Sequence, residues 1–405
     1  MIPYQIAEPF DPADYVYPRF SDEEYARRHK KAREFMAQRN LDCLLITGGG
    51  VAWDRCWSNI VYMTNFVGTM ELTGYLVFPM TGDPIISILR LNATLPDRAA
   101  RCLFGGVRGS TDYANVAADY IKEIGLEKAR FGVVELDGKF GIPANHRDIF
   151  ETELPDAEFV SVTLDWWGMR AEKSQEEIEA LEQAAHWGDL AHETLKETIR
   201  PGITERALHC AVYNRIYTEG ADHPSMVLIA SGPMSRPHTS FQRNRPVERT
   251  LEQGDMVIAE LGPRTPTGYE AQVGRTFALG PPTQLYKDMW ELTVTAEAAI
   301  ADVLRPGNTE MDVFEAGSII RNTKYIYVSP LMHGMYGIPS DAPRVFHERA
   351  PETRNPFVAH QLLDIEAHIA TPDRKIGVFM CNPYIVMPNG PPRCLSHYPR
   401  EIIVV

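Results

Sequence analysis

The chain has 405 residues, of which 44% are hydrophobic and 23% charged, as in ordinary globular proteins with room for two or three domains. Its 54 acidic residues outnumber its 40 basic residues, so the net charge of −14 argues against a nucleic-acid partner. No apolar run approaches the roughly 18 residues that span a bilayer, and the first residues lack the basic and apolar regions of an export signal. The six cysteines form no CxxC pair. We therefore expect a cytoplasmic protein without a membrane partner.

The first part of the chain alternates predicted helices and strands. Ser21 followed by Glu24 forms the pattern of a capping box, which predicts a helix over 22–39. Short apolar runs bounded by Gly, Pro or Asp are typical of buried strands, and they occur at 41–47, 73–80, 83–88, 130–136 and 158–164. This order predicts an α/β domain, which we assign to residues 1–168.

The second part of the chain, residues 169–405, contains an internal repeat. Ser174 and Glu177 predict a second capping box that opens a helix reaching about residue 197. The motif Arg-Pro-Gly-x-Thr-Glu then occurs twice, starting at Arg200 and at Arg305. Each copy has a predicted helix on either side, followed by extended segments. We therefore expect two related α-α-β-β halves that share one sheet with pseudo-twofold symmetry.

Several motifs follow one another in an order that resembles the pita-bread superfamily of methionine aminopeptidase, prolidase, aminopeptidase P and creatinase. They are SNIVYMTNF (58–66), KSQEEIEALEQAA (173–185), SGPMSRPH (231–238), GDMVIAELG (254–262), GYEAQVGRTFALG (268–280), MHGMYG (332–337), LLDIEAHI (362–369) and GVFMCNPYIVMPNG (377–390). The resemblance implies an α/β N-terminal domain of the creatinase and prolidase type and an α+β pita-bread catalytic domain. It also implies a small-molecule substrate and a homodimer.

Peptidases of this superfamily hold two metal ions with Asp, Asp, His, Glu and Glu side chains. The matching positions are Glu260, Gln272, His333, Glu366 and Cys381. A neutral amide does not replace a bridging carboxylate, and the two glutamates with a thiolate supply at most −3 against the +4 of two divalent ions. We therefore expect no dinuclear centre and no cofactor. The alternative is a single zinc or iron ion, bound by the His, Glu and Cys of this set with Gln272 or Glu260.

The resemblance to creatinase, which works without a metal, implies roles for individual residues. His238 matches its general base, Glu366 a carboxylate that binds the substrate's guanidinium, and His333 a further active-site histidine. With Glu260, these are the expected catalytic residues. The residues expected to contact substrate are Gln272, Arg275, Cys381, Phe66 and Tyr62, although Cys381 also fits a buried packing residue and Arg275 an ion-paired brace.

Two further regions resemble substrate-contacting parts of the family. Tyr62 and Phe66 belong to an aromatic cluster with Trp53, Trp57 and Met63, which can reach a partner's active site or simply pack in a core. Residues 340–351 carry a displaced His-Glu element and can act as a substrate lid or as a plain surface loop.

The leading hypothesis is a hydrolase that cleaves an amidino, ureido or amide C–N bond of a small polar metabolite. Creatine itself is a poor candidate substrate, because Gly274 occupies the position of a glutamate that contacts creatine in creatinase. A lyase similar to dimethylsulfoniopropionate lyase is one alternative. A mononuclear metal-dependent hydrolase of the Xaa-Pro dipeptidase type is another. A member of the fold that binds ligand without catalysis is the third.

Overall fold

The structure, a computed structural model, describes residues 18–48, 58–66, 74–89, 103, 106–134, 142–334 and 343–405. It separates into two compact units, residues 1–169 with 266–268, and residues 170–265 with 269–405. Within the described ranges, no helix combines the length and the apolar character needed to cross a membrane.

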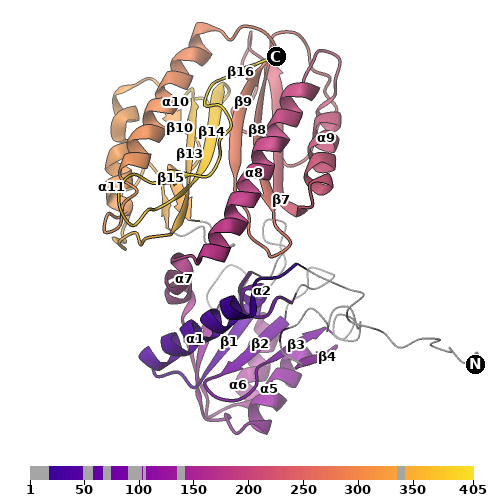
Figure 1. Cartoon of the computed structure of the whole chain (residues 1–405), viewed down its shortest axis with the longest axis vertical. Helices are drawn as coiled ribbons and strands as arrows, with labels where there is room; N and C mark the ends of the chain where they lie inside the picture. Colours follow the sequence, from indigo (N-terminus) through magenta and orange to yellow (C-terminus); the bar gives the residue numbers. More distant parts are fainter. Residues whose placement is uncertain are drawn as a thin grey trace, which may run out of the picture. The chain divides into compact units, whose positions relative to one another are not determined.

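The N-terminal unit is a mixed six-stranded sheet with the order β4-β3-β2-β1-β5-β6, packed against helices (Figure 1). Its elements are α1 (Asp22–Gln38), β1 (Cys43–Gly48), α2 (Ser58–Thr64), β2 (Gly74–Pro79), β3 (Ile85–Leu89), β4 (Val107–Ser110), α5 (Tyr113–Glu123), β5 (Arg130–Val134), α6 (Ala144–Glu153) and β6 (Glu158–Ser161), followed by α7 (Thr163–Ala171). All five predicted strands and the first helix are present. The predicted strand over 158–164 was too long, because Thr163 already begins α7.

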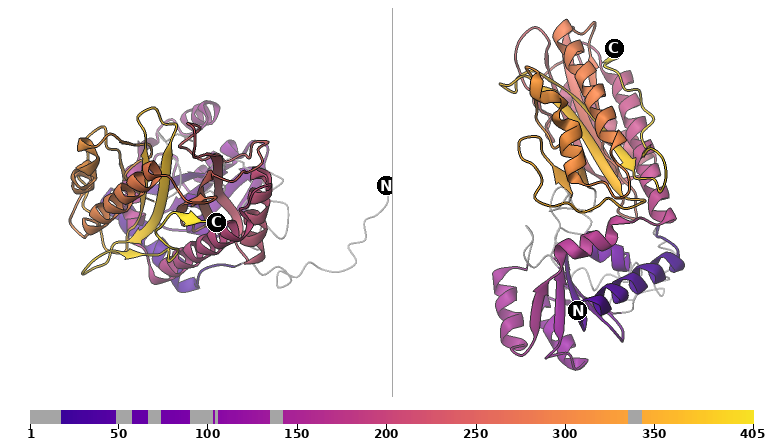
Figure 2. Two further views of the ribbon diagram at one scale, coloured as in Figure 1. Left: turned by 90° about the horizontal axis from the view of Figure 1, so that it is seen from above. Right: turned by 90° about the vertical axis from the view of Figure 1, so that its left-hand side faces the viewer.

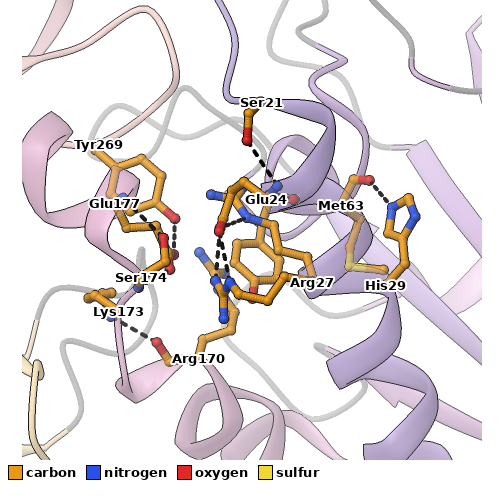
Figure 3. Close-up of polar contacts among 12 residues, drawn as sticks. Ser21, Glu24, Arg27, His29, Met63, Arg170, Lys173, Ser174, Glu177 and Tyr269 are labelled. Atoms are coloured by element: carbon orange, nitrogen blue, oxygen red, sulfur yellow. Dashed lines mark hydrogen bonds and ion pairs between the residues drawn. The ribbon is translucent and has the colours of Figure 1, made fainter.

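Polar contacts fix the start of α1 (Figure 3). Ser21 caps the helix by accepting a hydrogen bond from the main-chain N of Glu24 at 3.1 Å. The buried Glu24 carboxylate is bound in turn by Arg27 at 2.7 Å and by Arg28 at 2.6 Å. The cap that the sequence predicted is therefore confirmed, and the glutamate three residues on also holds two arginines of its own helix.

The C-terminal unit is built on one ten-stranded sheet. Its main path has the order β12-β11-β13-β14-β9-β8-β7. The elements are α8 (Gln175–Thr198), α9 (Glu205–Thr218), β7 (Asp222–Pro233), β8 (Asp255–Arg264), β9 (Val273–Ala278), α10 (Gln284–Asp302), α11 (Glu310–Ala316), the 3₁₀ helix η2 (Gly317–Asn322), β10 (Ile326–Tyr327), β11 (Met332–Gly334), β12 (Arg344–Val345), β13 (Leu362–Ala370), β14 (Gly377–Ile385), β15 (Arg393–Cys394) and β16 (Ile403–Val404).

The sequence repeat corresponds to a structural repeat, as predicted. Thr204 caps α9 and Thr309 caps α11, each with its side-chain oxygen. The glycines of the two motifs, Gly202 and Gly307, have φ values of 89° and 90°. Residues with a Cβ atom adopt this backbone conformation only at a cost in free energy. The capping box of α8 is also present, and Tyr269 donates a further hydrogen bond to its Glu177 (Figure 3).

The helices cover one face of the ten-stranded sheet (Figures 1 and 2). Helices α8 and α9 pack on Val257, Ala259 and Leu261 of β8, and α10 packs on Ile365 and other apolar residues of β13. Successive side chains of a strand point to opposite faces, so Glu260 and Glu366 project from the face that these helices leave uncovered. This face carries the candidate site.

We predict that the fully buried His192 of α8 makes the fold sensitive to acid. Its ring stacks on Phe277, its Nδ1 donates to the Gly188 carbonyl at 2.8 Å, and burial, aided by the charge of Arg275, lowers its pKa from 6.5 to about 3. Between pH 7 and pH 5 the unfolded chain binds a proton at this residue that the native state does not bind, which should lower the free energy of unfolding by about 2 kcal/mol.

The test is urea unfolding of the wild type and of His192→Gln at both pH values. On acidification from pH 7 to pH 5, the free energy of unfolding of the variant should fall by about 2 kcal/mol less than that of the wild type, whatever the stability of the variant at neutral pH. Equal losses in the two proteins would contradict the prediction.

Candidate functional site

Four residues from four strands form a row across the uncovered face of the ten-stranded sheet. Glu260 of β8 lies opposite Gly274 of β9, Gly274 lies opposite Cys381 of β14, and Cys381 lies opposite Glu366 of β13. Cross-strand partners point to the same face, and neighbouring strands are about 4.8 Å apart. The register therefore brings three of the predicted site residues together, with one glutamate from each half of the repeat at the ends of the row.

His333 joins the row through Glu366. It lies opposite Asp364, which is two residues from Glu366 and so on the same face of β13. The His333 Nε2 lies 3.0 Å from the Glu366 carboxylate and the Nδ1 lies 3.0 Å from the Gly334 carbonyl oxygen. Since both partners are acceptors, an imidazolium that donates to both satisfies the geometry. Burial alone would raise the pKa of Glu366, but the hydrogen bond and charge of His333, with a hydrogen bond from Ser329, hold it below its usual range.

Glu260 has the opposite environment. Burial raises its pKa well above the ordinary value, and the negative charge of Glu366 adds to this effect. The side-chain amide of Gln242 donates to Glu260 at 2.5 Å, which offsets only part of the rise. One face thus carries one carboxyl group that favours the protonated form and one that favours the ionised form. Paired carboxyls of this kind are suited to general acid and general base roles.

Cys381 and Gln272 contribute neutral donors. The thiol of Cys381 is fully buried and donates to the main-chain carbonyl of Gln272, with the sulfur 3.6 Å from the oxygen. Burial, with the nearby carboxylates Asp364, Glu260 and Glu366, raises the thiol pKa well above its usual value. Neither residue supplies a bridging carboxylate, so the donor set does not fit a pair of divalent ions. In the part of the chain that the structure describes, no three His, Cys, Asp or Glu side chains are grouped to hold a metal ion.

His238 lies on the segment that follows β7, on the same face of the sheet. Its ring packs on Gly232, where a Cβ atom would overlap it, and its main-chain N donates to Lys375 O at 2.9 Å. Gly232 is four residues along β7 from Leu228, the partner of Glu260, which corresponds to roughly 13 Å of strand. Burial is the main cause that lowers the pKa of His238, so the ring is neutral at pH 7 and able to accept a proton.

Several polar residues of this face were not expected from the sequence. The Nε2 of His368 donates to Ser240 O, its Nδ1 lies 3.0 Å from the Ser329 hydroxyl, and the exposed ring of Phe241 stacks on it at 5.6 Å. Asp364 and His368 flank Glu366 two residues away on either side, so the two-residue period of a strand could have revealed both. Gln242 and Ser329 reach the site from loops, and no local pattern marks them.

Arg275 requires a correction. It was expected to contact substrate or to brace the site by ion pairing, but it follows Gly274 and therefore points to the helix-covered face of β9. Its guanidinium is fully buried, and all five of its N–H groups donate, to the carbonyls of Pro399, Gly274, Cys381 and Tyr398 and to the Ser396 hydroxyl. No donor remains for a ligand. Arg275 instead fastens the C-terminal segment to β9 and β14.

Tyr62 and Phe66 of the N-terminal unit have the surroundings of packing residues. Both are buried, and Tyr62 lies edge-on to Trp166 and beneath the guanidinium of Arg28, 4.4 Å from the ring centre. Their contact with a substrate stays a prediction. Trp53 and Trp57 lie outside the described residues.

The expected lid is described only in part. Residues 340–342 lie outside the described ranges, while His347 packs edge-on to Tyr327 at 5.3 Å and lies 3.2 Å from Glu348. The contact with Tyr327 attaches the described part of the segment to β10, and its role as a lid stays a prediction.

We predict that Cys381 is unreactive in the native protein. A buried thiol with a raised pKa provides little thiolate, and thiolate is the form that alkylating agents attack. Iodoacetamide at pH 8 should modify the exposed Cys210 and leave Cys381 unmodified until urea is added, as read from peptide masses. Modification of both cysteines at similar rates in the native protein would contradict this prediction.

Two protein-family models match the chain. The Creatinase/Prolidase N-terminal domain model matches residues 28–172, and the Metallopeptidase family M24 model matches residues 179–388. The chain is 24% identical to a creatinase of a Bacillus species over 404 residues, covering 96% of this chain and 90% of that protein. It is 26% identical to an Xaa-Pro dipeptidase of Pyrococcus horikoshii over 385 residues, covering 92% and 98%.

A solved structure shares the fold. The crystal structure of the dipeptidase PepE from Mycobacterium ulcerans matches 96% of this chain and all of that chain, with a TM-score of 0.77 and 24% identity. The predicted α/β domain followed by a pita-bread domain is therefore confirmed. The chain belongs to metallopeptidase family M24, a family of hydrolases, and carries a creatinase/prolidase N-terminal domain.

Proposed function

We propose that this chain hydrolyses the C–N bond of a dipeptide or a similarly small amide. The observation that carries the proposal is the pair of glutamates on one sheet face, with Glu366 held ionised by His333 and Glu260 favouring the protonated form. The sequence alone favoured a bond other than a peptide bond. The dipeptidases among the relatives support hydrolysis of a dipeptide more strongly. Because a creatinase is also among the relatives, cleavage of a C–N bond other than a peptide bond is the second candidate function.

The residues of this chain can divide the work of hydrolysis. In the proposed reaction the neutral His238 accepts a proton from the attacking water, and the Glu260 carboxyl donates one to the leaving nitrogen. His333 and Glu366 together orient the scissile group. Because Asp364 lies beside this pair, the site favours a substrate that carries an ammonium or guanidinium group. Gln272 and Cys381 are proposed to border the substrate as neutral residues.

The test is turnover on a panel of dipeptides, including Xaa-Pro dipeptides, and of guanidino, ureido and N-acyl amino acids, followed by mass spectrometry. Cleavage of dipeptides supports the proposal, while turnover confined to guanidino or ureido compounds supports the second candidate. A product that lacks the added water indicates the lyase alternative. Saturable binding without turnover indicates a non-catalytic member.

We further propose that no pair of metal ions takes part, since Gln272 and Cys381 occupy the positions where bridging carboxylates would be needed. Elemental analysis after ordinary purification should show fewer than one transition-metal ion per chain, and activity should survive a chelator. If one ion per chain copurifies and Cys381→Ser loses both the ion and the activity, the single zinc or iron ion bound by His333, Glu366 and Cys381 is the correct alternative.

We predict that His238→Ala lowers kcat by about 100-fold while KM changes little, as removal of a general base typically does. In the wild type, kcat/KM should fall only at pH values below the usual histidine range, because burial lowers the pKa of His238 and protonation removes the base. This acidic limb should disappear in the variant. Normal turnover by His238→Ala would remove the residue from the mechanism.

We also propose a cytoplasmic homodimer in which Tyr62 and Phe66 approach the partner's site. The chain mass is 45.6 kDa, so light scattering during gel filtration should give about twice this value. A monomer that keeps full activity at high dilution would contradict this proposal.

A further inference from the structure

Glu205, the glutamate of the first Arg-Pro-Gly-x-Thr-Glu motif, is the centre of a buried polar network that the proposed reaction does not use. It lies in the first turn of α9 and is fully buried. One carboxylate oxygen accepts from the main-chain N of Ser231 at 2.9 Å and from its hydroxyl at 2.6 Å. Arg243 donates to both oxygens at 2.8 and 3.1 Å, and Val247 N donates at 3.2 Å.

These donors belong to the two ends of one segment. Ser231 is near the end of β7, whereas Arg243 and Val247 lie beyond the turn that carries the chain back. Arg243 also forms an isolated bridge with Ile229, with main-chain hydrogen bonds of 2.8 and 3.3 Å. Glu205 therefore closes a loop of residues 231–247 by binding both of its ends, and we call this loop the His238 loop.

The His238 loop supplies several contacts to the candidate site. His238 packs on Gly232, the Ser240 carbonyl accepts from His368, and Gln242 donates to Glu260. Gln242 is the immediate neighbour of Arg243, so the ion pair between Arg243 and Glu205 lies one residue from the hydrogen-bond partner of Glu260. Between Met234 and Leu251 the chain has no helix or strand of its own. Besides Glu205, the bridge of Arg243 with Ile229 and the hydrogen bonds of His238 and Ser240 to the carbonyls of Lys375 and Arg374 hold the loop.

We propose that Glu205 is a positioning residue that holds the His238 loop against the sheet face for catalysis. This inference rests on the proposed function for its catalytic consequence, but the holding of the loop can be measured without any substrate. A buried carboxylate suits this task because hydrogen bonds to a charged acceptor are stronger than those to a neutral one.

The second copy of the motif provides a parallel. Glu310, in the first turn of α11, is also buried, and it accepts from the hydroxyl of Thr353 at 3.4 Å. Thr353 lies in the segment that follows β12, beyond the strand that pairs with His333. In both halves the motif therefore places a buried glutamate against a segment between two strands of its own half, after β7 and before β8 in the first half and after β12 and before β13 in the second.

Hydrogen exchange read by mass spectrometry tests the proposal on the full chain. In Glu205→Gln the amides of residues 238–247 should exchange at least about tenfold faster than in the wild type, because the amide group adds donors where Arg243 needs an acceptor. Arg243→Ala serves as a second variant with a partly exposed side chain, and it should loosen the same peptides while the chain stays folded.

Glu297→Gln is the matched control. Glu297 is equally buried and accepts from Asn382 at 2.5 Å and from Tyr384 at 2.8 Å, but it lies on the helix-covered face. It should leave exchange of the His238 loop unchanged even if it lowers the melting temperature. Unchanged exchange of that loop in Glu205→Gln and Arg243→Ala, or equal acceleration in Glu297→Gln, would overturn the proposal.

With a substrate from the panel, Glu205→Gln should lower kcat by about tenfold while KM changes less. The conservative variant Glu205→Asp should have a kcat between those of Glu205→Gln and the wild type. Loosened exchange with unchanged kcat would overturn the catalytic part of the inference. If no compound is turned over by the wild type, the proposed function fails, and the exchange result still decides whether Glu205 holds the loop.

Discussion

The two faces of the ten-stranded sheet impose the constraint on which the site depends. Helices α8, α9 and α10 bury the odd-numbered apolar residues of β8 and β13, so a shift of either strand by one residue would expose that core to water. The same packing fixes Glu260 and Glu366 on the opposite face. The stability of the hydrophobic core and the position of the carboxylates are thus set by one register.

On that face, chemically identical side chains acquire different properties from their neighbours. Glu366 has a histidine at 3.0 Å and stays ionised, whereas Glu260 accepts from the neutral amide of Gln242 and favours the protonated form. The negative charge of the first glutamate strengthens the tendency of the second to keep its proton. Division into an acid and a base therefore follows from these two contacts, one from His333 of β11 and one from the loop residue Gln242, rather than from residue type.

Much of the fold could be predicted from the sequence because local rules act strongly there. Ser21, Ser174 and the two repeated threonines cap helices where the patterns indicated, and the ordered motifs led to the family and the two-domain fold. The site was harder to predict. Arg275 follows a motif glycine, yet strand alternation turns it towards the helices, while Gln242 and Ser329 enter from loops whose course depends on contacts far along the chain.

The row of site residues crosses from one half of the repeat to the other at a single pair of residues. Between β9 and β14 the register contains only Gly274 opposite Cys381, and the far end of β9 pairs instead with β16. Gly274 also leaves the space that the Phe379 ring fills. The separation of the two glutamates therefore depends on the angle between β9 and β14, which the hydroxyl of Thr276 helps to fix through hydrogen bonds of 2.9 and 3.0 Å with the main chain of Phe379.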